Sequence, residues 1–200
     1  MLSEEQVESL FKQAESFQDK VILTLFIDSK IRASELITLT REHVSQDHII
    51  VSGKTGERTV PISPLTYTML TKLAPAGPLF MLEGRPMRRE YLRIHLRELM
   101  EAAGITGKKL GPHILRHSAS VFHIMHGGDL MGLKEELGHT TLRMTEIYAQ
   151  LAINQVKQRH QETNVIGHIL DRLQPQTEVP EVFKKAFTDG GKNGPNEGTN

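Results

Sequence analysis

A single hairpin pattern, at residues 48 to 62, interrupts a sequence whose apolar residues otherwise recur at helical spacing. Strand-forming residues at 49 to 51 and 58 to 62 flank a Ser-Gly-Lys-Thr-Gly turn at 52 to 56, which predicts two short antiparallel strands. A third short strand is expected at 79 to 81. Because helical patterns precede and follow this region, we predict a mostly α fold with a small antiparallel β-sheet, an α+β arrangement.

Helix signals cover most of the remaining chain. Ser3 followed by Gln6 is typical of a capped N-terminus, so a helix should begin almost at the first residue. Further helices are expected at 19–28, from 33, after 64, at 87–103, from 112, and at 130–137, 141–151 and 154–173. Within 87–103 the expected core residues are Tyr91, Ile94, Leu99 and Met100.

The formal net charge is zero, with 24 Lys and Arg against 24 Asp and Glu, but the charges are unevenly distributed. Residues 30 to 120 hold 14 bases and 8 acids, whereas both flanking segments are net acidic. A basic centre is typical of a protein with one anion-binding face, although chance clustering gives the same pattern.

The chain contains no cysteine, which excludes a disulfide framework, a thiolate zinc site and a cysteine nucleophile. Its most apolar run, at 21 to 27, is far shorter than the roughly 20 residues that span a bilayer, and the N-terminus has no signal pattern. We therefore expect a soluble, cytoplasmic chain without a membrane partner.

His113 and Arg116 form the sharpest local feature. Gly111 and Pro112 indicate the start of a helix, and an i, i+3 pair in its first turn places an imidazole beside a guanidinium. Free backbone N–H groups at a helix N-terminus favour phosphate, which a guanidinium binds through two hydrogen bonds. The pair therefore indicates an anion site, while a surface salt bridge or a capping role remains open.

Four further positions carry polar groups that could act on such an anion. They are Arg32 at a helix start, Lys54 in the hairpin turn, His139 in a Leu-Gly-His turn and Tyr148 where an amphipathic pattern ends. An arginine is unfavourable at a helix N-terminus unless an anion is present, and Glu35 could pair with it. Taken singly, each of these residues also has an ordinary structural explanation.

Taken together in chain order, these residues resemble the catalytic domain of the tyrosine recombinases, the phage integrase family. The family pattern has an arginine in Gly-Leu-Arg-x-Ser-Glu-Leu, a hairpin lysine, His-x-x-Arg, Leu-Gly-His and a tyrosine. The matching residues are Arg32, Lys54, His113, Arg116, His139 and Tyr148, and the resemblance covers about residues 1 to 160. One departure is Ser29-Lys30-Ile31, which stands where Thr-Gly-Leu is common.

The resemblance implies a reaction in which Tyr148 attacks a DNA phosphodiester. The products are a 3′-phosphotyrosyl intermediate and a free 5′-hydroxyl, which then attacks a partner strand. His113 is expected to accept the tyrosine proton, and Lys54 to protonate the leaving oxygen. No metal and no cofactor is required.

The same resemblance assigns the groups around the phosphate. Arg32 and Arg116 would stabilise charge on the phosphoryl oxygens, and His139 would donate to a non-bridging oxygen. Glu35 is expected to orient the arginines or the hairpin.

Three arginines spaced by four, in the segment 87–103, are candidates for contacts with the DNA backbone. They are Arg89, Arg93 and Arg97. The alternative is a solvated helix face whose charges are balanced by Glu90, Glu98 and Glu101.

The expected partner is double-stranded DNA, bound by a homo-oligomer, a tetramer in this family, in the cytoplasm of a prokaryotic, archaeal or viral system. We assign residues 1–173 to the catalytic domain, 174–189 to a C-terminal segment that docks on a neighbouring protomer or folds back in cis, and 190–200 to a disordered tail. Family members usually carry an N-terminal core-binding domain, so we expect either a fragment or a minimal enzyme.

The leading hypothesis is a site-specific DNA recombinase or integrase. A type IB topoisomerase-like relaxase would use the same chemistry without exchanging strands, and a non-catalytic DNA-binding regulator would have lost it. A metal hydrolase is disfavoured, because His113 and His139 lack a matching ligand at helix spacing.

Overall fold

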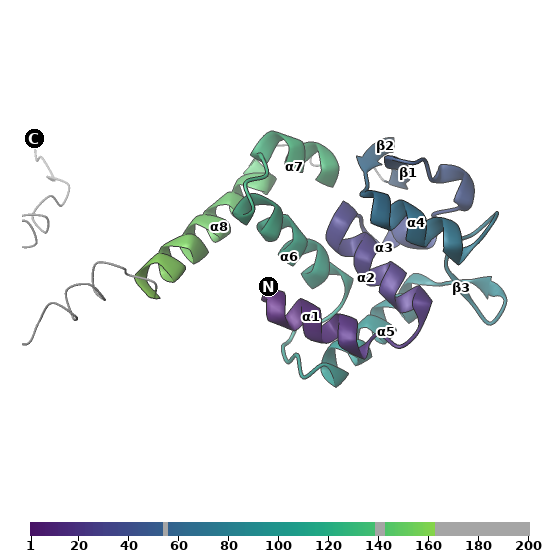
Figure 1. Ribbon diagram of the computed structural model, residues 1–200, viewed down its shortest axis with the longest axis horizontal. Coiled ribbons are helices and arrows are strands. Elements are labelled where there is room, and N and C mark those ends of the chain that lie inside the picture. The colour runs from purple at the N-terminus through teal and green to yellow at the C-terminus, as the bar shows by residue number, and fades with distance from the viewer. Residues whose placement is uncertain (54–55, 139–142, 163–200) are drawn as a thin grey trace, which may run out of the picture. The chain divides into compact units, whose positions relative to one another are not determined.

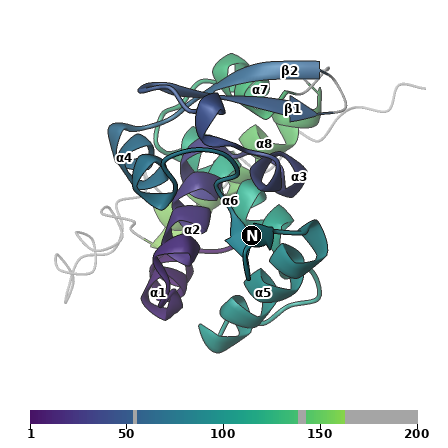
Figure 2. The same cartoon turned by 90° about the vertical axis from the view of Figure 1, so that its right-hand side faces the viewer.

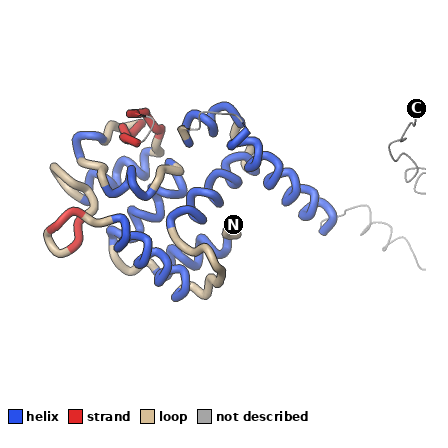
Figure 3. The backbone as a smooth tube through the Cα atoms, turned by 180° about the vertical axis from the view of Figure 1, so that it is seen from behind, coloured by secondary structure: helices blue, strands red, loops and turns tan. Residues whose placement is uncertain are grey.

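The computed structural model describes residues 1–53, 56–138 and 143–162, and within them it confirms a mostly helical fold with a small antiparallel sheet (Figure 3). Residues Met1–Val156 form one compact unit, and Lys157–Asn200 are assigned to a second. The elements in chain order are α1 (Glu4–Gln13), α2 (Phe17–Ser29), α3 (Ala33–Ile37), the 3₁₀ turn η1 (Arg41–His43), β1 (His48–Gly53), β2 (Gly56–Pro61), α4 (Pro64–Leu73), β3 (Met81–Leu82), β4 (Arg85–Pro86), α5 (Arg89–Ala102), α6 (Pro112–Met125), α7 (Leu130–Leu137) and α8 (Arg143–Glu162).

The boundary expected at residue 173, and the segments 174–189 and 190–200, lie outside the described residues. These domain assignments therefore stay predictions.

Helix α2 lies at the centre of the core. Its apolar run is buried almost all round, and Ile22, Leu25 and Phe26 have no exposed surface. A helix that is apolar on every side must be covered on every side. Helices α4 and α6 pack against it, and Figure 1 shows α6 running beside α2.

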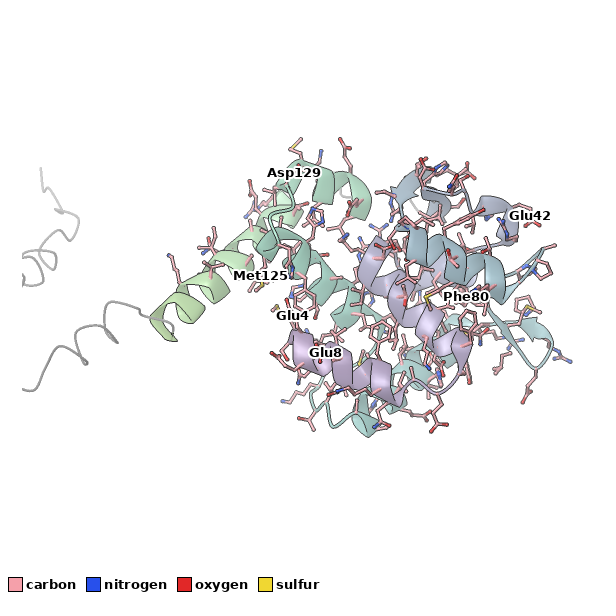
Figure 4. The ribbon with its side chains drawn as sticks, viewed as in Figure 1. Glu4, Glu8, Glu42, Phe80, Met125 and Asp129 are labelled. Atoms are coloured by element: carbon pink, nitrogen blue, oxygen red, sulfur yellow. The ribbon has the colours of Figure 1, made fainter. Side chains whose placement is uncertain are left out.

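The first helix begins where the sequence predicts. The Ser3 hydroxyl accepts from the Gln6 backbone N–H, and the Gln6 side chain accepts from the Ser3 backbone N–H, which completes a capping box. The Leu2 backbone N–H donates to the Ser118 hydroxyl at 2.7 Å and so ties this end of the chain to α6. Glu4 points from the same end of α1 (Figure 4), and its carboxylate lies 3.3 Å from His126 Nε2.

The predicted hairpin is present, with Ile49 opposite Val60 and Val51 opposite Arg58. Side chains on one face alternate with those on the other, so Val60 and Arg58 share the face that carries Ile49 and Val51. Those three apolar residues are buried. Helix α7 contacts β2, and Figure 2 shows it behind the hairpin. An arginine therefore lies on the inner face of the hairpin.

The third strand is shifted from the position expected. Strand β3 pairs with β4 in a two-stranded sheet of its own and does not extend the first hairpin. The Leu79 backbone N–H instead donates to the Leu39 carbonyl at 3.1 Å. Phe80 is fully buried (Figure 4). Burial of Phe80 and the bond to Leu39 hold this segment against the helices.

Two helix predictions were wrong in detail. The buried side of α5 consists of Leu92, Leu96 and Met100, whereas Tyr91 and Ile94 are exposed. Helix α8 is continuous from Arg143 to Glu162, with no break at the position expected after residue 151.

Candidate active site

The link between α2 and α3 has an unusual backbone at Lys30. This residue adopts the left-handed conformation, with φ 53° and ψ 27°, and caps α2. Glycine occupies that conformation with least strain, which explains why a glycine is common here in the family pattern. Lys30 Nζ donates to Glu136 at 2.7 Å and to the Asp28 carbonyl at 3.0 Å.

Arg32 and Glu35 are fixed to each other at the start of α3. Arg32 is the N-cap residue, and its backbone N–H donates to Glu35 Oε2 at 2.7 Å. Its Nη1 donates to Glu35 Oε1 at 2.9 Å. The Arg32 side chain remains 34% exposed, while that of Glu35 has no exposed surface. Glu35 thus orients the Arg32 guanidinium, and the exposed part of that group remains accessible to a ligand in solvent.

Glu35 also receives Arg58 from the inner face of the hairpin. Both Nη atoms of Arg58 donate to the two carboxylate oxygens. Burial alone would raise the pKa of Glu35, but hydrogen bonds from Arg58 and Arg32, together with the Arg58 charge, outweigh it and hold the pKa below its ordinary value. The carboxylate is therefore ionised and orients two arginines.

Sequence reasoning missed Arg58. A signal was present, because in the alternating pattern of β2 this arginine falls on the same face as Val60, where a lone surface arginine is unexpected.

Arg116 is the most enclosed of the described arginines, with 7% of its surface exposed. Its Nη1 donates to the Lys30 carbonyl at 2.5 Å and its Nη2 to the Leu137 carbonyl at 2.9 Å. Burial, and then the nearby charges of Arg32 and Arg58, lower the pKa of Arg116 to about 10, while Glu35 and Tyr148 act in the opposite direction. The group still carries its charge at neutral pH.

The C-terminal end of α7 is bound by two arginines. Arg58 Nε donates to the Glu136 carbonyl at 3.2 Å, next to the Leu137 carbonyl that accepts from Arg116. These carbonyls form the negative end of the helix dipole, which attracts cations. Gly138 caps the helix in the left-handed conformation, and a Cβ there would lie 3.0 Å from Arg58 Cδ. The end of α7, up to Gly138, is thereby fixed to the arginines.

Tyr148 lies on α8 beside this cluster. The charge of an ionised Tyr148 would raise the pKa of Arg116, so the two groups lie within electrostatic range of each other. Its ring centroid is 5.2 Å from that of His117, with 54° between the ring planes. His117 is the second site residue that sequence reasoning missed. No local signal marks it, because the contact joins two helices.

The predicted site residues fall into three groups. Those that the structure brings together are Arg32, Glu35, Arg116 and Tyr148. His113 lies in the first turn of α6 but is exposed, and within the described part of the chain no hydrogen bond or ion pair involves it. Lys54 and His139 lie outside the described residues.

The α5 arginines form a separate, exposed surface. Arg93 pairs with Glu90 at 2.6 Å and Arg97 with Glu101 at 2.8 Å. Helix α5 reaches the start of α6, since a Cβ on Gly111 would lie 3.8 Å from Arg93 Cγ.

Arg32 and Arg58 thus share the Glu35 carboxylate, and the guanidinium of Arg116 lies near both of them, so three positive charges face one negative charge. A partly enclosed excess of positive charge of this kind suits an anion such as a phosphate. Across residues 1–53, 56–138 and 143–162, no three His, Asp or Glu side chains are arranged to hold a metal ion. No described helix is both long and apolar enough to cross a membrane.

Comparison with known proteins identifies a matching family and relatives of similar sequence. The model of the phage integrase family matches residues 1–155. Tyrosine recombinase XerD of Vibrio cholerae is 32% identical over 181 residues, which are 80% of this chain and 60% of that relative. The chain thus spans about 60% of the length of this curated relative.

Two solved structures are similar in fold. The crystal structure of XerA recombinase matches with a TM-score of 0.70 and 23% identity, over 80% of this chain and 64% of that one. The catalytic domain of bacteriophage HP1 integrase matches with a TM-score of 0.62 and 26% identity, over 82% of this chain and 95% of that one.

Proposed function

The chain belongs to the phage integrase family, and we propose that it cleaves and rejoins DNA strands as a site-specific tyrosine recombinase. The observation that carries this proposal is the contact of the Tyr148 ring with His117, the residue that follows buried Arg116, next to a cluster where Arg32 remains open to a ligand. A phenol at the edge of an anion site is suited to attack a bound phosphodiester. The curated relative of similar sequence carries the name tyrosine recombinase.

In the proposed reaction, the Tyr148 hydroxyl oxygen forms a bond to phosphorus while the bond from phosphorus to the 5′-oxygen breaks. Attack by the 5′-hydroxyl of a partner strand reverses this step and releases the tyrosine. The phosphodiester energy is retained in the covalent link, so rejoining requires no ATP.

Two proton transfers accompany the cleavage step. A free tyrosine has a pKa of about 10 and is ionised to only about one part in a thousand at pH 7, so the proton must pass to a neighbouring base. We assign that base to His113 and the acid that protonates the 5′-oxygen to Lys54. Both assignments come from the family resemblance.

Two arginines are assigned to the phosphoryl oxygens, where negative charge grows in the transition state. A guanidinium carries five N–H donors, so Arg116 can hold the Lys30 and Leu137 carbonyls and still donate to phosphate. Arg32 reaches the ligand from its exposed side. We assign His139 to a non-bridging oxygen on the family pattern alone. Glu35 acts through the arginines that it orients.

The test uses nicked duplexes from which a short cleaved fragment diffuses away, so that a covalent adduct accumulates. The duplexes carry a randomised segment, and the DNA captured covalently is amplified and sequenced. We expect an EDTA-resistant adduct that mass spectrometry maps to Tyr148. The variant Tyr148→Phe should form none, Tyr91→Phe should match the native chain, and Arg32→Ala should react about 10²- to 10³-fold more slowly.

The same experiment separates the alternatives. Relaxation of a supercoiled plasmid without a recombinant product would replace the recombinase by a type IB topoisomerase-like relaxase. No adduct on any duplex, even with an N-terminal core-binding domain supplied, would overturn the enzyme and favour a non-catalytic DNA-binding regulator.

We propose that the partner is double-stranded DNA, met in the cytoplasm, and that Arg89, Arg93 and Arg97 contact its backbone. Support comes from the position of α5, whose Arg93 approaches Gly111 at the start of the helix that carries Arg116. The ion pairs of Arg93 and Arg97 are half exposed or more, so phosphate can displace the carboxylates at little cost.

Assembly of a tetramer on DNA is a further proposal. A hydrophobic groove of about 460 Å³ opens between α1, α2, α4 and α6, lined by Phe11, Ile27, Leu65 and Phe122. Leu65 is 64% exposed there. We assign this groove to residues 180–187 of a neighbouring copy, whose sequence Pro-Glu-Val-Phe-Lys-Lys-Ala-Phe includes the large apolar side chains of Val182, Phe183 and Phe187.

Deletion from Val179 onward and the substitution Leu65→Glu should each prevent tetramer formation on DNA, measured by mass photometry. Phe17→Glu, which alters an exposed apolar residue outside the groove, should not. If the deletion lowers the melting temperature of the free chain but leaves assembly intact, the segment folds back in cis.

A further inference from the structure

Helix α8 rests on the compact unit through one narrow face. Thr145 and Ala152 are buried on that face, and Tyr148 lies between them at helical spacing. The larger apolar residues Ile147 and Ile153 are 58% and 48% exposed and point elsewhere. Among the described side chains of this helix, the two that are buried are small, so they bury little apolar area.

The aromatic contact on this face comes from His117. A centroid distance of 5.2 Å and an angle of 54° fall within the range preferred by aromatic pairs. Burial, and to a smaller extent the positive amino group of Met1, lower the pKa of His117, which favours the neutral ring. The preceding residue, Arg116, carries the buried guanidinium. Helix α6 therefore supplies both the charge and the ring surface beside the phenol.

His113 does not make this contact in the DNA-free chain. It is exposed in the first turn of α6, one turn before His117. The imidazole that packs on the tyrosine is thus a different one from the imidazole assigned to accept its proton.

We propose that His117 is the positioning residue for the nucleophile: its ring holds Tyr148 in cis, beside Arg116, before DNA binds. This inference rests on the proposed function, because it takes Tyr148 as the attacking group. The ring surface is the operative part, and no nitrogen of His117 is required.

The first test measures docking without any reaction. The chain has three tyrosines, so labelling with 3-fluorotyrosine gives three ¹⁹F signals, which Tyr→Phe substitutions assign. His117→Ala should move the Tyr148 signal towards that of an exposed tyrosine, while His117→Phe should keep it displaced. We expect the equilibrium constant for docking of Tyr148 on α6 to fall by about two- to tenfold in His117→Ala. This is the factor that an aromatic pair contributes beyond its burial.

The chain offers a matched control in a second His–Tyr pair. His95 and Tyr91 on α5 stack with centroids 5.5 Å apart and 9° between planes. His95→Ala should shift the Tyr91 signal, leave the Tyr148 signal in place and leave cleavage of the nicked duplex unchanged.

The second test measures cleavage of the nicked duplex at saturating DNA. The cleavage rate should fall by up to about tenfold in His117→Ala, the same factor as for docking. It should return to the native value in His117→Phe, and the apparent Kd for DNA should be unchanged in both variants. Thermal unfolding of each variant shows that the compact unit is intact.

The outcomes are separable. A Tyr148 signal that does not move in His117→Ala overturns the inference, whether or not the chain cleaves DNA. Failure of His117→Phe to restore both the signal and the rate also overturns it and assigns the role to a ring nitrogen. If the native chain forms no adduct, the proposed function fails, while the ¹⁹F signal still reports whether His117 docks Tyr148.

Discussion

Replacing Arg58 with methionine would leave the buried carboxylate of Glu35 with one arginine in place of two. Methionine keeps most of the aliphatic stem, so the guanidinium is the main group removed. Its loss eliminates two hydrogen bonds to Glu35 and one to the Glu136 carbonyl. Breaking a buried ion pair costs about 3–5 kcal/mol. Because Arg32 still binds the carboxylate, we expect the free energy of unfolding to fall by about 3 kcal/mol, at the lower end of that range.

The loss of unfolding free energy in Arg58→Met should depend on pH. In the native chain the pKa of Glu35 is lowered, so its stabilisation is complete above the ordinary value of 4.5 and disappears as the pH falls through the lowered pKa. Without Arg58, burial is opposed by the Arg32 hydrogen bonds alone, so the pKa of Glu35 is higher than in the native chain and the ionised carboxylate contributes less stability as the pH rises. The difference between native and variant should therefore be larger at neutral pH than at mildly acidic pH.

Urea unfolding followed by far-UV circular dichroism measures both effects in a chain that has no tryptophan. Arg97→Met is the matched control, because Arg97 and its partner Glu101 are 58% and 49% exposed, and it should cost less than about 1 kcal/mol. The double variant Glu35→Leu with Arg58→Met should recover part of the loss, since it leaves no buried charge. A loss at Arg58 no larger than the control, or one that does not shrink on acidification, would refute the reasoning.

Three other predictions concern the backbone at Lys30, an exposed carboxylate and the DNA surface. Both Lys30→Gly and Lys30→Ala lose the ion pair with α7, but only glycine relieves the left-handed backbone, so urea unfolding should show the glycine variant to be more stable by about 1 kcal/mol. A hydrogen bond from the Thr40 side chain, with a further backbone bond, lowers the pKa of Glu42 to about 2, so its stabilisation is present above 4.5 and lost as the pH falls towards 2. A ¹³C NMR titration should give that midpoint, and Thr40→Val should raise it; a midpoint near 4.5 in the native chain would contradict the assignment. Arg93→Gln and Arg97→Gln should each reduce the slope of log Kd against log salt by about 1 in fluorescence anisotropy, and unchanged slopes would remove them from the DNA surface.

Local signals in the sequence were sufficient for much of the fold. Ser3 and Gln6 satisfy each other within one helical turn, and the turn at 52–56 determines which residues of the hairpin face each other. Such features need no distant partner, so the pattern along the chain predicts them well. The prediction of the buried face of α5 was less accurate, because this helix has more apolar residues than one face can hold. Leu92 is buried there, whereas Tyr91 is exposed.

The site was predictable where the family pattern marks a residue and not where only tertiary contacts do. Arg32, Arg116 and Tyr148 carry motif positions, and the structure brings them together. Arg58 and His117 act through partners on other elements, Glu35 and Tyr148. Sequence spacing contains no information about such pairs until the packing of α6, α8 and the hairpin is known.

The carbonyl groups that align the arginines have a consequence for evolution. Arg116 is held by the carbonyls of Lys30 and Leu137, and Arg58 in part by that of Glu136. Every residue type supplies a carbonyl, so substitutions at these three positions change side chains without removing the acceptors. The glycine common at position 30 can therefore be exchanged for lysine without loss of the acceptor, and what limits substitution there is the left-handed backbone and not the hydrogen bond to Arg116.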